Sequence, residues 1–278
     1  MERMNRLMIF EGTRKLCEGE DKLKSAIAAS REKQRIYWEG EKIEYSDARF
    51  MSAARMRLSP QKTVQAAAPY ARAGKKTCIL NFASSVSPGG GVCTGAQAQE
   101  ESICRVSTLY FALSDPETAG RFYDHHWELI RRGEMNRRNR DDIIYTPGVV
   151  VVRDDADGEV MMQESDWYEV DVITCAAPDL RQLGDAAQYT PEPGELLKVF
   201  ETRWRCILSA AARHEADVLI LGAFGCGVFA NPPLVVVKAF NNVLDEFRNY
   251  FETIEFAVYS PRQDDLNYQT FSGIKGIL

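Results

Sequence analysis

The sequence has no long hydrophobic run. Across its 278 residues, no uninterrupted apolar stretch approaches the ~20 residues that a membrane helix needs. Residues 1–22, MERMNRLMIFEGTRKLCEGEDK, mix charged with apolar side chains and lack the hydrophobic stretch of a secretory signal peptide. We therefore predict no membrane partner and a cytoplasmic location.

Disulfide and metal signals are missing as well. The seven cysteines are scattered and form no CxxC pair, which disfavours both a disulfide framework and a zinc site. Most of them stand among apolar or small residues, so we interpret them as buried free thiols. The three histidines form no HxxxH or HExxH pattern. We predict that the protein binds no metal and needs no cofactor.

Positive charge is not in excess, because the formal net charge is −6. Direct binding along a nucleic-acid backbone is therefore disfavoured. The local exception is RRGEMNRRNR at 131–140, which contains five arginines. It is either a solvated loop or helix face, or a patch that steers a polyanionic substrate.

The sequence does contain a regular alternation of local patterns. Residues 1–75 look helical and polar, with helical patterns at 11–38, 46–58 and 60–73 and with Ser46 and Asp47 as candidate caps of the second. After residue 76, β-rich runs alternate with helical patterns. The β-rich runs are 77–84, 143–154, 168–178, 216–224 and 253–260, and the clearest helical patterns are 101–113 and 233–247.

This alternation predicts an α/β fold with a mostly parallel sheet that is covered on both faces. Ligands of such folds bind at the carboxyl ends of the strands. Two glycine-rich stretches fall at such ends: NFASSVSPGGG follows the strand that ends near Asn81, and GAFGCGVFANPP follows VLIL.

The second glycine-rich stretch places Gly222, Gly225 and Gly227 between a buried strand and a helix. Backbone N–H groups at such a junction can hold a phosphate without arginine or lysine. The stretch is neither a Walker loop, since no GK[ST] follows, nor a GxGxxG dinucleotide fingerprint. The alternative is a tight turn that binds nothing.

The first glycine-rich stretch continues as GGGVCTGAQAQEE over 89–101. Neighbouring residues at a helix start point roughly 100° apart, so Glu100 and Glu101 do not readily flank one glycosidic bond from opposite sides. A division of roles fits better, in which one carboxylate holds sugar hydroxyls and the other is the single acid/base. A nearby diphosphate would raise the pKa of that acid and the helix N-terminus would lower it, and the residues leave the outcome open. The alternative is a pair that caps the helix.

The spacing GGG, seven residues, then QEE resembles the signature of the bacterial-type poly(ADP-ribose) glycohydrolases. YTPGVVVVRDD, VITCAAP and LGAFGCGVFANPP are also similar to that family, in its order, and EGTRKLCEGE resembles its helical extension. The resemblance implies a macrodomain-like three-layer α/β/α sandwich with a mixed, mostly parallel sheet. It implies an N-terminal helical extension over 1–75, packed on a catalytic domain over 76–278.

The resemblance also implies the reaction and the residues that carry it. The reaction is hydrolysis of the ribose–ribose O-glycosidic bond at the end of poly(ADP-ribose), which releases ADP-ribose. Glu101 would be the acid/base that protonates the leaving 2′-oxygen and then deprotonates the attacking water, and Glu100 would orient the sugar through its hydroxyls. The implied substrate-binding residues are Asn81, Gly89, Gly90, Gly91, Gln99, Gly225, Cys226, Gly227, Val228 and Phe229.

The adenine site and the substrate linkage stay open. Tyr259 is a candidate adenine contact, with core packing as its alternative. The partner is poly(ADP-ribose) or another ADP-ribosylated substrate, so hydrolysis of mono-ADP-ribose on protein, DNA or a small metabolite is one alternative. A reader that binds ADP-ribose without turnover is disfavoured by the second glutamate. A dinucleotide-dependent oxidoreductase is disfavoured by the missing fingerprint.

Overall fold

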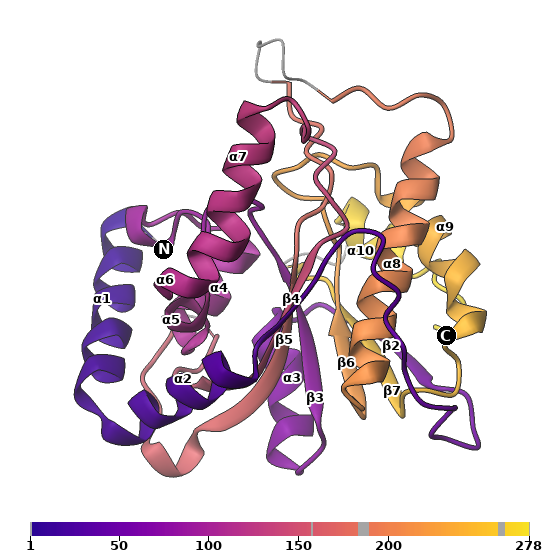
Figure 1. The fold of residues 1–278 in the computed structure, drawn as a ribbon. Helices are drawn as coiled ribbons and strands as arrows, with labels where there is room; N and C mark the ends of the chain where they lie inside the picture. Colours follow the sequence, from indigo (N-terminus) through magenta and orange to yellow (C-terminus); the bar gives the residue numbers. More distant parts are fainter. Residues whose placement is uncertain (1, 157, 183–188, 261–264, 278) are drawn as a thin grey trace.

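The computed structural model describes residues 2–156, 158–182, 189–260 and 265–277 (Figure 1). Within them, seven strands form one sheet in the order β1-β4-β5-β3-β6-β7-β2. The four pairs from β5 to β2 are parallel, and β4 pairs antiparallel with both β1 and β5. The strands are β1 (Arg35–Tyr37), β2 (Arg55–Ser59), β3 (Thr77–Phe82), β4 (Ile143–Val151), β5 (Tyr168–Cys175), β6 (Val218–Leu221) and β7 (Thr253–Ala257). The predicted mixed, mostly parallel sheet is confirmed.

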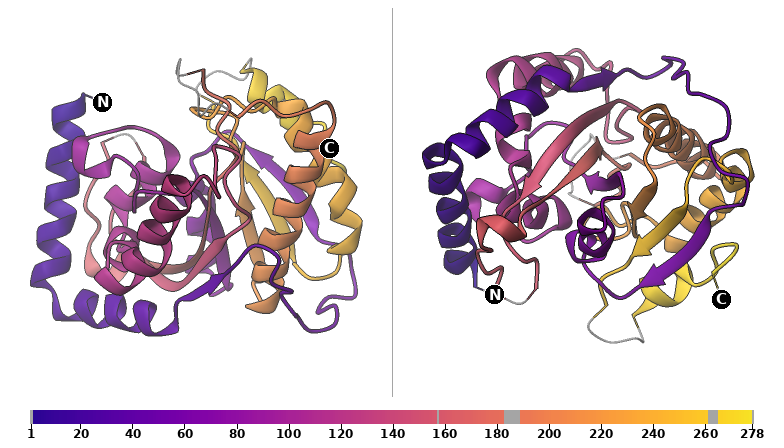
Figure 2. Two further views of the ribbon diagram at one scale, coloured as in Figure 1. Left: turned by 45° about the horizontal axis from the view of Figure 1, so that its top comes forward. Right: turned by 90° about the horizontal axis from the view of Figure 1, so that it is seen from below.

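Helices cover both faces of this twisted sheet (Figure 2). The α-helices are α1 (Arg3–Gly19), α2 (Asp21–Lys33), α3 (Thr63–Arg72), α4 (Gln99–Val106), α5 (Leu109–Leu113), α6 (Pro116–Thr118), α7 (His125–Arg131), α8 (Glu195–Arg213), α9 (Pro233–Val243) and α10 (Leu266–Phe271). Shorter turns are η1 (Val92–Thr94), the π-helical η2 (Ala119–Asp124), η3 (Glu164–Asp166) and η4 (Leu244–Glu246).

Each central strand contributes side chains to two separate cores, because successive residues of a strand point to opposite faces. In β3, Cys78 and Leu80 belong to the core under α8 and α9, while Ile79 belongs to the core under α3 and α4. Both faces of the strand are therefore buried, which explains its continuous apolar sequence. The three-layer arrangement is confirmed.

Residues 1–75 are not helical throughout. The helical pattern expected at 46–58 is wrong, because Arg55–Ser59 forms the edge strand β2, parallel to β7. Met56 and Leu58 alternate with two arginines and pack on the core, which is the period of a strand and not of a helix. Arg35–Tyr37 likewise joins the sheet as β1. A domain boundary at residue 75 stays a prediction, although strands from both sides of it form one sheet.

The helix expected at 101–113 is divided into α4 and α5. Ser107 lies between them and forms an isolated β-bridge with Val151, the last residue of β4. Its side-chain hydroxyl donates back to the carbonyl of Ile103 at 2.7 Å. The end of α4 is thus fixed to the sheet, which holds the helix start at a constant position.

All seven cysteines are free. Four of them are buried, as expected, whereas Cys93 is exposed and the expectation is wrong for it; the buried ones are Cys17, Cys78, Cys104 and Cys175. In the part of the chain that the structure describes, no helix is both long and apolar enough to cross a membrane.

His214 makes the folded state sensitive to acid. Its ring stacks on Tyr145 with centroids 3.5 Å apart, and its Nε2 shares a hydrogen bond with the Tyr37 hydroxyl at 2.8 Å. Burial, together with the charges of Lys76, Arg213 and Arg35, lowers the pKa of His214 to about 4 from 6.5.

Between these two pKa values the unfolded chain binds a proton that the folded chain does not. The free energy of unfolding is therefore expected to fall as the pH drops from 6.5 to 4. Urea unfolding at several pH values should show a weaker fall in His214→Gln than in the unmodified protein. His125→Gln, at the exposed first residue of α7, is the matched variant that controls for the loss of a histidine. Equal curves for His214→Gln and the unmodified protein would contradict this assignment.

Candidate active site

The two glycine-rich stretches meet at one edge of the sheet. β3 and β6 are parallel neighbours, so the loops that follow them leave the sheet from the same end. Phe82 at the end of β3 and Phe224 in the second loop pack with ring centroids 5.6 Å apart. The predicted meeting of both loops at the carboxyl ends of the strands is confirmed.

The triple glycine closes over both glutamates. Gly89 and Gly90 have φ of +67° and +58°, which side chains rarely adopt. A Cβ on Gly90 would lie 2.5 Å from Oε1 of Glu101 and 3.0 Å from Oε2 of Glu100. A Cβ on Gly91 would lie 2.8 Å from Cβ of Ala96. The loop can therefore pass over the carboxylates only without side chains.

Glu101 has one fixed oxygen and one free oxygen. It lies in the first turn of α4 and is 7% exposed. Its Oε1 accepts a hydrogen bond from the N–H of Gly91 at 2.8 Å. Its Oε2 is buried and has no hydrogen-bond partner among the described residues. A buried carboxylate oxygen without a partner is costly, and a ligand hydroxyl would remove that cost.

Glu100 has both oxygens engaged and is 2% exposed. Its Oε2 accepts from the N–H of Ser84 at 2.7 Å, and its Oε1 accepts from Nδ2 of Asn81 at 3.2 Å. Burial raises the pKa of Glu100 to about 8, although both hydrogen bonds act in the opposite direction. Because the partners of Glu100 and Glu101 belong to other segments, neither carboxylate serves as a cap of α4.

Asn81 lies on β3 directly behind Glu100. Its Nδ2 is shared between Glu100 and Oγ1 of Thr174, while its buried Oδ1 has no partner among the described residues. The structure thus brings Asn81 into the group of the two glutamates. A direct contact between Asn81 and a ribose stays a prediction.

Gln99 joins the start of α4 to the end of β3. Its Oε1 accepts from the N–H of Phe82 at 2.8 Å, and its Nε2 donates to the carbonyl of Leu80 at 2.7 Å and to Thr63 at 3.0 Å. These contacts place the glutamine of the QEE sequence as a link within the protein. Its predicted contact with the substrate remains untested.

The second glycine loop has a closed side and an exposed side. Gly225 has φ of +75°, and a Cβ there would lie 2.6 Å from Cβ of Ala177. Burial raises the pKa of the Cys226 thiol to about 12, so this thiol stays neutral. Gly227 and Val228 are exposed, with Val228 at 58%, and Phe229 is half-buried beneath the guanidinium of Arg181.

Asn231 holds this loop in place and was not singled out from the sequence. Its Nδ2 donates to the carbonyl of Gly225 at 2.9 Å and to the carbonyl of Pro178 at 2.7 Å. The loop is thereby tied to the segment that follows β5. The asparagine of GAFGCGVFANPP carried no separate signal, because its partners are backbone carbonyls, one of them 53 residues away in the sequence.

The first helix fixes the spacer between GGG and QEE. Nε of Arg3 donates to the carbonyl of Thr94 at 2.7 Å, and Nε of Arg6 donates to the carbonyl of Gly95 at 2.8 Å. Nη1 of Arg6 also donates to Oε1 of Gln97 at 3.0 Å. The first helix, α1, therefore supports the loop that covers the glutamates.

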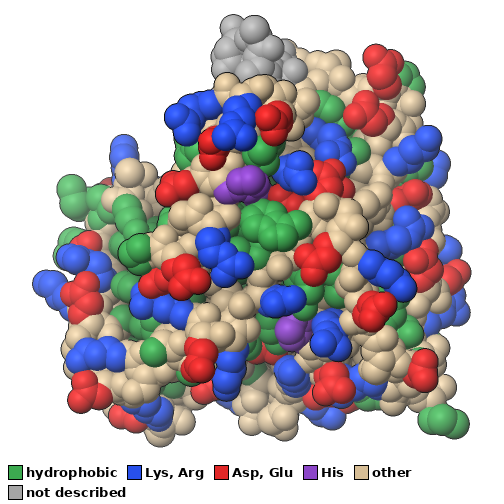
Figure 3. Space-filling model, in the orientation of Figure 1, with side chains coloured by type: hydrophobic (Ala, Val, Ile, Leu, Met, Phe, Trp, Pro, Cys, Tyr) green, Lys and Arg blue, Asp and Glu red, His purple; other side chains and the backbone are tan. Residues whose placement is uncertain are grey.

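The arginine-rich stretch 131–140 is largely neutralised by carboxylates. Arg137 pairs with Asp179, and Arg138 and Arg140 both pair with Glu39. Basic side chains at the top of the molecule indeed have acidic side chains among them (Figure 3). Since the charges compensate one another, this arrangement does not favour the steering alternative.

Tyr259 follows β7 and is 54% exposed. The ammonium group of Lys62 lies 5.9 Å from the centre of its ring. The core-packing alternative for Tyr259 is therefore wrong. Its ring is accessible for stacking, and an adenine contact stays a prediction.

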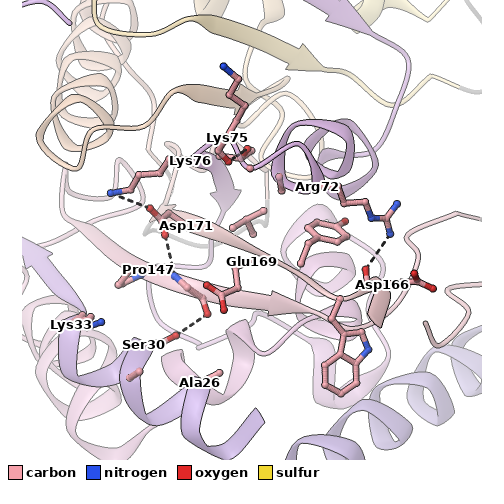
Figure 4. A pocket seen from close by; sticks show the side chains of 18 of the residues that line it. Ala26, Ser30, Lys33, Arg72, Lys75, Lys76, Pro147, Asp166, Glu169 and Asp171 are labelled. Atoms are coloured by element: carbon pink, nitrogen blue, oxygen red, sulfur yellow. Dashed lines mark hydrogen bonds and ion pairs between the residues drawn. The ribbon is translucent and has the colours of Figure 1, made fainter. Parts of the chain in front are cut away.

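A cavity of about 1020 Å³ lies at the opposite, amino end of β3 and β5 (Figure 4). None of the predicted site residues lines it. At this cavity Nζ of Lys76 pairs with Oδ2 of Asp171 at 4.0 Å, and Nη2 of Arg72 donates to the backbone carbonyl of Asp166. Among the described residues, no group of three or more His, Cys, Asp or Glu side chains could hold a metal ion.

Comparisons with known proteins agree with this geometry. The family model of the microbial-type PARG (poly(ADP-ribose) glycohydrolase) catalytic domain matches residues 8–154, more than half of the chain. A comparison with curated protein sequences found no match.

Solved structures of poly(ADP-ribose) glycohydrolases are similar over nearly the whole chain. That of the Thermomonospora curvata protein has a TM-score of 0.82 at 29% identity, covering 98% of this chain and 99% of that one. The same protein bound to the inhibitor ADP-HPD gives a TM-score of 0.79 at the same identity and coverage. A Deinococcus radiodurans protein in complex with ADP-ribose gives 0.74 at 33% identity, covering 88% and 95% of the two chains.

Proposed function

Because this chain belongs to the microbial-type poly(ADP-ribose) glycohydrolase family, we propose that it cleaves the terminal ribose–ribose O-glycosidic bond of poly(ADP-ribose) and releases ADP-ribose. It is a glycosidase that acts on ADP-ribose polymers. The observation that carries the proposal for the site is the free, buried Oε2 of Glu101 beneath the triple glycine.

Glu101 is the acid/base of the proposed reaction. The N–H of Gly91 holds its Oε1, so the side chain cannot turn without losing that bond, and Oε2 is left for the substrate. From there the carboxyl group donates its proton to the leaving 2′-oxygen of the ribose, as the glycosidic bond breaks. The resulting carboxylate then accepts a proton from the attacking water.

Glu100 orients the ribose in this proposal. Asn81 and the N–H of Ser84 hold its carboxyl group rigidly, and each of its oxygens keeps a second lone pair for a sugar hydroxyl. The exposed backbone at Gly227 and Val228 lies at the same sheet edge and would receive the diphosphate, together with Gly225 and Cys226. Both glycine loops would thus hold the substrate while Glu101 reacts.

Release of free ADP-ribose from purified poly(ADP-ribose) is the direct test. The protein should shorten the polymer and accumulate ADP-ribose, which chromatography separates from longer products. Mono-ADP-ribosylated protein and ADP-ribosylated DNA serve as parallel substrates, and faster release from one of them would favour that linkage instead. Calorimetric binding of ADP-ribose without release from any substrate would show a reader.

Gly90→Ala is expected to lower kcat/KM by ~10–100-fold, because the new Cβ displaces both carboxylates that lie beneath it. Steady-state release of ADP-ribose measures this. Gly133→Ala is the matched control, since Gly133 also has a positive φ of +71° but no atom within 4 Å of the new Cβ. Both variants should lose about 1 kcal/mol of stability through backbone strain. Equal activity of the two variants would contradict the close approach at Gly90.

A cytoplasmic location stays part of the proposal. Free thiols throughout the chain support it, because cysteines of proteins in oxidising compartments are commonly paired in disulfides.

A further inference from the structure

His126 is a buried histidine close to the proposed active site that has no role in the reaction described above. It lies in the first turn of α7 and is 2% exposed. Its Nδ1 is 2.8 Å from the carbonyl oxygen of Ser85, and its Nε2 is 2.8 Å from Oδ2 of Asp142. Both ring nitrogens therefore face oxygen atoms.

Neither of these oxygens can supply a proton. The Ser85 oxygen is a backbone carbonyl, which only accepts. Burial acts to raise the pKa of Asp142, but hydrogen bonds from His126 and the Glu39 N–H, and the charge of Arg140, together lower it. Because the Ser85 carbonyl only accepts, Nδ1 of His126 is the donor of that hydrogen bond, and Asp142 orients the ring through Nε2.

His126 is enclosed by protein side chains, and few other charged groups lie near its ring. Nε of Arg140 donates to Oδ2 of Asp142 at 2.9 Å and lies 3.4 Å from Glu39. The backbone N–H of Glu39 donates to the other oxygen of Asp142. The rings of Phe122 and Trp38 pack against the imidazole at centroid distances of 4.3 and 6.4 Å, and His125 lies 6.1 Å away.

The carbonyl that His126 holds belongs to the turn that also holds Glu100. Ser84 donates its N–H to Glu100, and the next residue accepts from His126 through its carbonyl. The following carbonyl, of Val86, accepts from Nε1 of Trp127 at 3.0 Å. Two successive residues of α7 therefore hold two successive carbonyls of this turn.

We propose that His126 is a positioning residue, whose bond to Ser85 fixes the turn that aims Glu100 at the ribose. The carboxyl group of Asp142 holds the ring in this orientation through Nε2, so that Nδ1 faces the Ser85 carbonyl. This inference rests on the proposed function of the site. It adds to that function a link from the arginine-rich stretch, through Arg140 and Asp142, to the sugar-holding carboxylate.

Two substitutions at position 126 separate positioning from a merely structural role. In His126→Asn the side-chain amide can occupy the place of Nδ1 and keep the bond to Ser85. In His126→Gln the amide reaches the place of Nε2 and keeps the bond to Asp142 instead. Each variant loses one buried hydrogen bond of the imidazole, so thermal melting should show a loss of stability in both.

Activity should separate the two variants. We expect His126→Gln to lower kcat by ~10-fold and to weaken ADP-ribose binding by several-fold, and His126→Asn to retain most of both. His125→Gln, at the exposed neighbouring position, controls for changes in α7. Equal kcat and equal ADP-ribose affinity of the Asn and Gln variants would overturn the inference.

The binding measurement keeps this test independent of turnover. If the unmodified protein releases no ADP-ribose from any substrate, the proposed function fails. Calorimetry with ADP-ribose still compares the two variants in that case. A weaker affinity of the Gln variant alone would support the positioning role, and equal affinities would refute it.

Discussion

Glu101→Gln is expected to lower turnover of poly(ADP-ribose) by more than ~100-fold, as for the loss of a general acid/base. Glutamine keeps an oxygen that can accept from the N–H of Gly91, so the loop over it should stay in place. The amide nitrogen then takes the place of Oε2, and an amide cannot protonate the leaving 2′-oxygen as a carboxylic acid does. ADP-ribose affinity should therefore change by no more than a few-fold, and single-turnover release together with calorimetry measures both quantities.

Glu100→Gln is the matched control at the neighbouring carboxylate. Its amide would face the N–H of Ser84 or Nδ2 of Asn81, both of which are donors, so the ribose should be held less well. We expect a smaller fall in kcat than in Glu101→Gln and a clear loss of affinity. The roles of the two glutamates are reversed if Glu100→Gln loses turnover while Glu101→Gln keeps it.

Arg105→Met is expected to destabilise the protein by about 3–5 kcal/mol, the cost of breaking a buried ion pair from one side. Nε and Nη2 of Arg105 donate to the two oxygens of Glu159 at 2.8 Å each, and both side chains are almost fully buried. Nη1 also donates to the carbonyl of Ala96. Methionine fills much of the volume but leaves the Glu159 carboxylate without its counter-charge. Guanidinium unfolding measures the loss.

Two further variants show whether the buried charge causes this loss. Arg14→Met removes exposed ion pairs with Glu11 and Glu18 and should leave the stability nearly unchanged. The double variant Arg105→Met/Glu159→Met should recover part of the loss, because the carboxylate that Arg105→Met leaves without Arg105 is then removed as well. A double variant that is less stable than Arg105→Met would contradict the explanation.

The loop over the glutamates is held in place by side chains of two helices. Residues 94–97 are held by Arg3 and Arg6 from α1 and by Arg105 from α4. A Cβ on Gly95 would lie 2.8 Å from the carbonyl of Arg3, so the first helix packs directly on the loop. The helix α1 thus supports the proposed active site.

Local sequence predicted the elements whose signals are contained within a few residues. The five apolar runs became β3 to β7, since a buried strand needs apolar side chains on both faces. The proline at the start of α9 agrees with its expected beginning. Local sequence failed to predict the strand at Arg55–Ser59. The apolar–polar alternation there is short and stands next to residues with a helical pattern, and pairing with β7 decides the conformation.

The sequence by itself determined the parts of the proposed site: a bare loop, an acid pair behind it and a second glycine loop. Only the tertiary structure decided which carboxylate oxygens of the acid pair have hydrogen-bond partners. Glu101 and Glu100 are neighbours in the chain, yet one keeps a free oxygen and the other has none, because their partners come from Gly91, Ser84 and Asn81. Such partners are backbone and side-chain atoms brought near by strand pairing and helix packing, and no local pattern encodes that proximity.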